Sequence, residues 1–323
     1  MNIDRGTLYR HQAENWLRGL LLISGLAALL CLIGWVIAGG AGVAWALGLG
    51  VILLLVSARI PPRLILARSA AQQLPPSAAP VLHAMLQELA ARAGLGARPM
   101  LWYVPSPELN AFAVGTRNNG AIAVTAGLLR TLPRRALAGV LAHEISHLRH
   151  NDTWVMTLAA MLSEVTAWLA LIGQLLLLAL LPLVLRGDVD LPWLALMLLA
   201  IAPTASTLLQ LALSRNREFA ADLEAVNLTG DPQGLADALS RLESNRGIWL
   251  ENIFLPRRNH TRLPRWLRTH PDTGERIERL LAMLPKRRIP PLMISDPSRD
   301  GHLGLSIPDT RVRRPRRSRV FRL

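Results

Sequence analysis

The sequence predicts a mainly α-helical membrane protein, with four transmembrane helices and an α+β domain assembled from two chain segments. The chain has 323 residues, 51% of them hydrophobic, and a mean hydropathy of +0.29, which argues against an ordinary soluble enzyme. Its apolar residues gather in long uncharged runs, and two polar regions remain at residues 59–153 and 214–323. Together these regions hold about 200 residues, enough for one folded domain.

The first apolar run predicts a transmembrane hairpin within residues 1–58. Residues 19–58 form a stretch of 40 residues without a charged side chain. A continuous helix of that length would reach about 60 Å, twice the hydrocarbon core of a bilayer. The glycine-rich sequence at residues 39–42 predicts a tight turn near its middle. The run is too long for a signal peptide.

A second transmembrane hairpin is predicted within residues 154–213. Its two uncharged runs, residues 165–185 and 191–214, are joined by the short link 186–190. Glu164 borders the first run, and the 21 residues that follow it already span the hydrocarbon core. We therefore expect Glu164 at the membrane interface.

The placement of arginines predicts the orientation in the membrane. The two hairpin turns hold a single arginine, Arg186, beside two aspartates. The segments on the other side of the four runs carry Arg5, Arg10, Arg18, Arg59, Arg63, Arg68, Arg215 and Arg217. Because positive residues favour the cytoplasmic side, both termini and the polar domain are expected in the cytoplasm.

The polar domain contains a metal-binding pattern. Residues 136–150 read as a helix in which His143, Glu144 and His147 form His-Glu-x-x-His. Side chains four residues apart lie on one helical face, so both imidazoles can bind one zinc ion. Glu144 is rotated by about 100° from His143, which suits a general base better than a ligand. The lone cysteine, Cys31, lies in an apolar run, which excludes a cysteine-rich site.

Glu218 is the predicted third metal ligand. A third histidine ten residues after His143 is absent, because that position is Thr153. His150 follows His147 by three residues and could in principle join the ligands, but it is expected at the helix end as a polar cap or as a partner of a ligand. Glu218 and Asp222 are again four residues apart, so Asp222 can accept a hydrogen bond from a ligand imidazole. The alternative is an ordinary solvated helix, in which Arg215 and Arg217 pair with these acids.

Taken together, these motifs resemble the HtpX family of bacterial membrane zinc metalloproteases, which are relatives of the type I CaaX prenyl endopeptidases. Three further stretches carry the resemblance: Asn110-Ala111-Phe112-Ala113, residues 121–129, and Thr269-His270-Pro271 with Arg276. The resemblance implies a zincin-like domain of the gluzincin type, with one zinc ion per chain. It also implies substrates that are misfolded or damaged membrane proteins, cleaved at the bacterial inner membrane.

Residues for substrate binding and for oxyanion stabilisation are implied by the same resemblance. Asn110, Ala111 and Phe112 would contact the substrate backbone, although a turn-forming asparagine explains Asn110 equally well. Short β-rich runs at 102–104 and 122–125 predict a strand edge that could hold an extended peptide. His270 and Arg276 could each donate to the oxyanion, with Tyr103 as a further candidate; otherwise they are a helix cap and a surface arginine.

The C-terminal residues predict a disordered basic tail. Residues 311–323 hold seven arginines and no acid, within a chain of net charge +14. Each arginine near an anionic membrane surface contributes about 1 kcal/mol, so contact with anionic lipid is the expected role. Nucleic acid is not an expected partner, because Phe321 is the single aromatic residue among these arginines.

Two alternative functions remain at this stage. A specialised membrane processing protease would be closer to the prenyl endopeptidases, but four predicted spans differ from the seven-helix chamber of those relatives. A non-catalytic zinc-binding adaptor or chaperone would not need the base Glu144. The predicted organisation is a hairpin (1–58), a first catalytic segment (59–153), a second hairpin (154–213), a second catalytic segment (214–290) and a basic tail (291–323).

Overall fold

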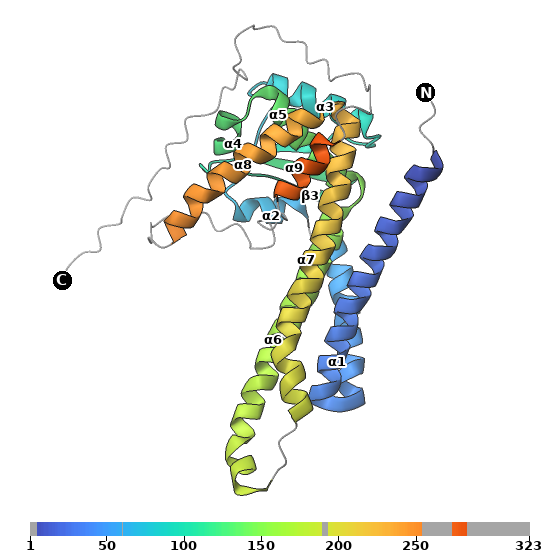
Figure 1. Cartoon of the computed structure of the whole chain (residues 1–323), viewed down its shortest axis with the longest axis vertical. Coiled ribbons are helices and arrows are strands. Elements are labelled where there is room, and N and C mark those ends of the chain that lie inside the picture. The colour runs from blue at the N-terminus through green and yellow to red at the C-terminus, as the bar shows by residue number, and fades with distance from the viewer. Residues whose placement is uncertain (1–4, 60, 189–192, 254–272, 283–323) are drawn as a thin grey trace, which may run out of the picture.

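The computed structural model describes residues 5–59, 61–188, 193–253 and 273–282. Three long helices, α1 (Arg5–Arg59), α6 (Asp152–Arg186) and α7 (Trp193–Thr229), are apolar and long enough to cross a membrane. They form an elongated stalk, and the shorter elements gather at one end of it (Figure 1). The predicted mainly helical architecture with a small sheet is confirmed.

Helix α1 is interrupted where the sequence predicts a turn. Ala38 and Gly39 have non-helical backbone angles, with φ of 58° at Gly39. Gly34 and Gly42 would be about 12 Å apart along a straight helix. Instead, a Cβ atom added to Gly42 would lie 1.9 Å from the carbonyl oxygen of Gly34. The chain therefore reverses direction here, and the two arms of α1 lie side by side (Figure 1).

Helices α6 and α7 extend well beyond the uncharged runs that predicted them. The runs cover residues 165–185 and 191–214, whereas α6 begins at Asp152 and α7 ends at Thr229. Both helices therefore continue into the polar domain. Glu218 and Asp222 lie on this continuation of α7, so the predicted third ligand is on the same helix as an apolar span.

The polar domain contains a four-stranded sheet in the order β1-β2-β4-β3. Strand β2 (Met100–Val104) pairs in parallel with β4 (Asn119–Thr125) and antiparallel with β1 (Gln72–Gln73). Strand β3 (Ala111–Thr116) pairs antiparallel with β4, with Ala111 opposite Val124. Among the described strands, β3 is therefore the edge next to β4.

Helices cover the sheet and connect the two polar regions. The remaining helices are α2 (Pro62–Arg68), α3 (Pro80–Arg92), α4 (Ala126–Thr131), α5 (Arg134–Arg149), α8 (Pro232–Ile253) and α9 (Thr273–Leu281). Helix α5 packs closely against α8. A Cβ atom added to Gly139 would lie 3.0 Å from the backbone of Leu235. One hydrophobic cluster contains residues from before α6 and from after α7, including Leu137, Ile145 and Leu235. This packing fixes the buried helix α5.

Candidate metal centre

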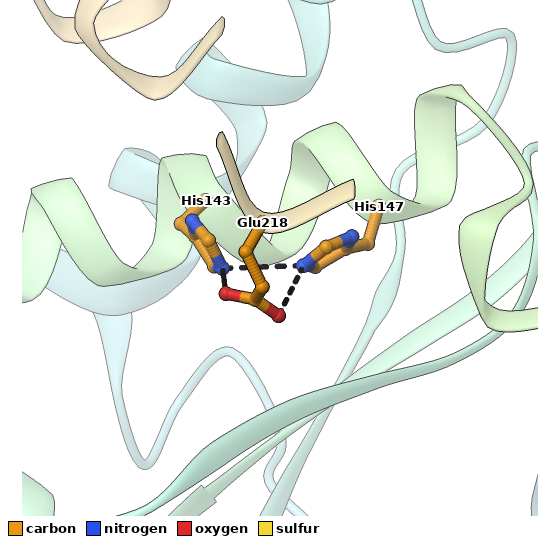
Figure 2. A group of neighbouring side chains, drawn as sticks. All are labelled: His143, His147 and Glu218. Atoms are coloured by element: carbon orange, nitrogen blue, oxygen red, sulfur yellow. Dashed lines mark hydrogen bonds and ion pairs between the residues drawn. The ribbon is translucent and has the colours of Figure 1, made fainter. Parts of the chain in front are cut away.

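Three side chains from two helices converge beside the sheet (Figure 2). His143 and His147 lie one turn apart on α5, and Glu218 reaches them from α7. The two Nε2 atoms are 3.1 Å apart. Glu218 Oε2 lies 3.2 Å from Nε2 of His143, and its Oε1 lies 3.7 Å from Nε2 of His147. The structure thus brings together the three residues predicted to bind metal.

Each of the two imidazoles also faces a carboxylate with its other nitrogen. Nδ1 of His143 lies 3.0 Å from Oδ1 of Asp222, as the sequence predicts. Nδ1 of His147 lies 3.0 Å from Oδ2 of Asp152, at the start of α6. A carboxylate at Nδ1 favours the tautomer that carries its proton there. Both Nε2 atoms are then left as electron-pair donors.

This arrangement fits a bound divalent cation. Two Nε2 lone pairs and a carboxylate converge within 4.8 Å, and they would repel one another without a positive charge between them. Tetrahedral zinc with bonds of about 2.0–2.1 Å would hold two nitrogens roughly 3.3 Å apart, close to the observed separation. The ligand set of two histidines and one glutamate is also that of catalytic zinc sites, which leave a fourth position open.

Electrostatics of the centre favour positive charge. Burial alone would lower the pKa of His143, but the nearby charges of Glu218 and Asp222 raise it to about 10. The pKa of His147 is also raised: its burial opposes the shift, but the hydrogen bond to Asp152 and the charges of Glu218 and Asp152 together outweigh the effect of burial. A site that attracts a proton this strongly is a site with excess negative charge.

Arg276 of α9 is buried between the carboxylates. Its Nε and Nη2 atoms bond the two oxygens of Asp222, each at 2.7 Å, and its Nη1 atom lies 2.9 Å from Oε2 of Glu218. Burial opposes the charge of Arg276, but Asp222, Glu218 and Glu144 together raise its pKa. All three guanidinium nitrogens therefore face carboxylates, whereas the sequence predicted an oxyanion donor.

Glu144 directly follows His143 on α5, and its side chain is buried, with 5% of its surface exposed. Its charge is close enough to Arg276 to raise the pKa of that side chain. Glu144 does not belong to the group of three converging ligand atoms. Glu144 is therefore a buried neighbour of the candidate ligands on α5 and is not one of the three.

Asp152 is a residue of the site that the sequence reasoning missed. It is 3% exposed, and its second oxygen, Oδ1, accepts a hydrogen bond from Nη1 of Arg217. Its signal in the sequence is its position directly after the end of the histidine helix, where Asn151 adopts a left-handed conformation. Arg215 pairs with Glu275 instead, so the predicted alternative pairing of these arginines is not observed.

The other residues that the sequence singles out lie on or beside β3, on β2, at the end of α5, or outside the described residues. Ala111 and Phe112 are buried on β3, and Asn110 precedes this strand with its N–H bonded to Thr125 Oγ1. Tyr103 belongs to the hydrophobic cluster of the polar domain. His150 caps α5, as predicted, by donating from Nδ1 to the carbonyl of Ser146 at 3.0 Å. His270 and the basic tail lie outside the described residues.

Several known proteins are similar to this chain. The model of peptidase family M48 matches residues 76–284. A protease HtpX homologue from Acaryochloris marina is 39% identical over 294 residues, which are 83% of this chain and 94% of that protein. A homologue from Acidiphilium cryptum is 38% identical over 83% of this chain and 96% of its own length. The crystal structure of S. mikatae Ste24p aligns with a TM-score of 0.44 and 20% identity, over 84% of this chain and 66% of that one.

Proposed function

This chain belongs to peptidase family M48 and is a membrane metalloprotease, and from that premise we propose that its metal is a single zinc ion. The proposed ligands are His143, His147 and Glu218. One observation carries the proposal: two imidazoles, each with Nδ1 at 3.0 Å from a carboxylate, turn their Nε2 atoms toward each other and toward Glu218. Such a set is stable when a cation lies between its members.

The proposed reaction is hydrolysis of a peptide bond. When bound, zinc polarises the scissile carbonyl and acidifies the attacking water. Glu144 takes the proton from that water and later delivers it to the leaving amine. Asp222 and Asp152 hold the two ligand imidazoles in one tautomer and orientation.

Arg276 is assigned a positioning role in this proposal. Its guanidinium holds Asp222 through two hydrogen bonds and contacts Glu218, so it fixes a ligand and the partner of another ligand. Since its three nitrogens already face carboxylates, the oxyanion donor is assigned to another residue. His270 remains the candidate from the sequence motif.

The proposed substrate position is along β3. Edge strands bind extended peptides through backbone hydrogen bonds. The carbonyl of Asn110 accepts from the N–H of Thr125 on β4, so strand alternation directs the backbone groups of Ala111 and Ala113 away from β4. We assign Asn110, Ala111 and Phe112 to this peptide-binding edge.

The proposed topology has four crossings, because the break at Ala38 and Gly39 divides α1 into two arms. The polar regions 59–153 and 214–290 then form one catalytic domain on the cytoplasmic face of the inner membrane. The shared hydrophobic cluster supports this assembly. The basic residues 291–323 are proposed to contact anionic lipid.

The proposed biological role is quality control of membrane proteins, by cleavage of misfolded or damaged chains. A specialised processing protease is the alternative, and substrate range distinguishes the two. A quality-control enzyme should cleave several unrelated unfolded proteins, whereas a processing enzyme should cleave one folded substrate at one bond.

The experiment that tests this function compares two glutamate variants of the purified protein. Glu144→Gln should retain one zinc per chain, measured by mass spectrometry of the metal, and lose cleavage of casein. Glu218→Ala, the matched control, should lose both zinc and cleavage. Wild-type casein cleavage that survives removal of zinc by a chelator would contradict the proposal, as would full activity of Glu144→Gln.

A further inference from the structure

A cavity of about 600 Å³ lies where the apolar helices meet the polar domain. Its floor contains Leu20 and Leu54, from the two arms of α1, and Leu158 of α6. Its polar side contains Arg117 from the β3–β4 turn, His150 at the end of α5, and Arg217 of α7. The cavity is therefore apolar at one end and basic at the other.

The basic end is suited to an anion. No acidic residue lines the cavity. Arg217 uses Nη1 to hold Asp152, but its Nε atom is buried with no hydrogen-bond partner among the described residues. His150 uses Nδ1 for its helix cap, which leaves Nε2 available. Arg117 is exposed, and its Nη2 atom donates to the carbonyl of Gly94 at 2.7 Å. A phosphate group accepts hydrogen bonds from both arginine and histidine side chains.

The apolar end lies at the depth where a membrane begins. The first apolar span runs from Leu17 to Ser57, so Leu20 and Leu54 each lie three residues from its ends. Trp154, which also lines the cavity, is two residues from the start of α6. Tryptophan is enriched at this interfacial level of membrane proteins.

These observations together define the ligand class. We propose that the cavity binds a phospholipid with an anionic headgroup, whose phosphate contacts Arg117, His150 and Arg217 while an acyl chain lies over Leu20, Leu54 and Leu158. A free phosphate ion would satisfy the basic end alone, and a neutral lipid the apolar end alone. The site shares Arg217 with the metal centre, because the same guanidinium holds the partner of His147.

Native mass spectrometry of the full-length protein in a neutral detergent tests the proposal. The ligands compared are phosphatidylglycerol, phosphatidylcholine and glycerol phosphate. We expect phosphatidylglycerol to bind at least tenfold more tightly than either of the others. Arg117→Glu should weaken its binding about tenfold. Leu158→Trp, which fills the floor, should weaken both lipids.

The control variant is Arg130→Glu, which makes the same charge change on an exposed residue of α4 outside the cavity. It should bind phosphatidylglycerol like the wild type. All variants keep the basic tail, so any contact between lipid and tail contributes equally to each of them and does not affect the comparison. Equal binding of the two lipids, or equal losses in Arg117→Glu and Arg130→Glu, would overturn the proposal. Equal binding of glycerol phosphate and phosphatidylglycerol would also overturn it, because the site would then take an anion and not a lipid.

Discussion

His147 and Asp152 lie on two different helices, and Nδ1 of the histidine is 3.0 Å from the carboxylate of the aspartate. His143 stands in the same relation to Asp222. Behind each aspartate lies an arginine, Arg217 in the first case and Arg276 in the second. The centre thus has two parallel Arg–Asp–His chains, and each ends at an Nε2 atom that faces Glu218.

Asp152 should contribute to metal affinity as much as Asp222 does. Asp152→Ala removes the hydrogen-bond acceptor of His147, and we expect zinc to bind about 10–100-fold more weakly. Asp152→Asn keeps an acceptor and should lose less. Competition with a fluorescent chelator measures the dissociation constant. Asp237→Asn on α8, away from the centre, is the control. Unchanged zinc affinity in Asp152→Ala would show that the hydrogen bond to His147 does not support the ligand.

Arg276→Lys should be damaging although the charge is kept. A lysine ammonium cannot hold both oxygens of Asp222 and contact Glu218 at once. Leaving buried carboxylates incompletely paired costs about 3–5 kcal/mol when a partner is lost, and part of this loss is expected here. The melting temperature of the zinc-loaded protein and its affinity for zinc should both fall.

The matched control for Arg276→Lys is Arg279→Lys on the same helix. Arg279 is exposed and pairs with Glu275 one turn earlier, so its replacement should cost about 0.5 kcal/mol or less. Similar stability losses in the two variants would refute a specific role for Arg276.

The start of α8 offers a prediction about pH. The hydrogen bond from Arg135 is the largest factor that lowers the pKa of Asp231, and Asp231 Oδ1 also accepts the N–H of Gly234 at 3.1 Å. Asp231→Ala should cost about 1 kcal/mol near neutral pH, as for other helix caps. A lowered carboxyl pKa stabilises the fold above the unfolded pKa, and this stabilisation is lost as pH falls through the folded pKa.

The measurement is thermal unfolding of metal-free wild type and Asp231→Ala at pH 7 and at pH 3. The difference in melting temperature between the two proteins should be a few degrees at pH 7 and should shrink at pH 3. A difference that stays constant or grows on acidification would be inconsistent with a lowered pKa of Asp231.

Topology is tested by reporter fusions. Fusions after residue 58 and after Leu323 should report cytoplasm, and one at Gly187 should report the outside, because arginines favour the cytoplasmic face. The proposed ligands lie on both sides of the α6–α7 hairpin, so they meet only if both sides are on one face. An outside signal at Leu323 would exclude the proposed arrangement of spans.

Local spacing was sufficient to predict most of the centre. His143 and His147, like Glu218 and Asp222, are four residues apart, and helical periodicity alone places each pair on one face. Asp152 follows His147 by five residues, which is not a same-face spacing. Its contact depends on the left-handed turn at Asn151 that redirects the chain, and no periodic pattern reveals such a turn.

Helix lengths and arginine partners also depend on tertiary structure. Charged residues end an uncharged run but not a helix, so α6 and α7 continue past the predicted limits. Arg217 and Arg276 look in sequence like surface residues, whereas the fold pairs each with an aspartate from a distant segment. Long-range pairing of this kind is decided by packing, and single-sequence patterns do not encode it.

The order of the ligands along the chain has a consequence during synthesis. His147 leaves the ribosome 71 positions before Glu218, and the whole second apolar hairpin lies between them. At about 5–20 residues per second, several seconds separate the two events. The nascent polypeptide therefore holds an incomplete ligand set until α6 and α7 have been made. A protease built in this order has no complete three-ligand centre with which to cut neighbouring chains until α7 has been made.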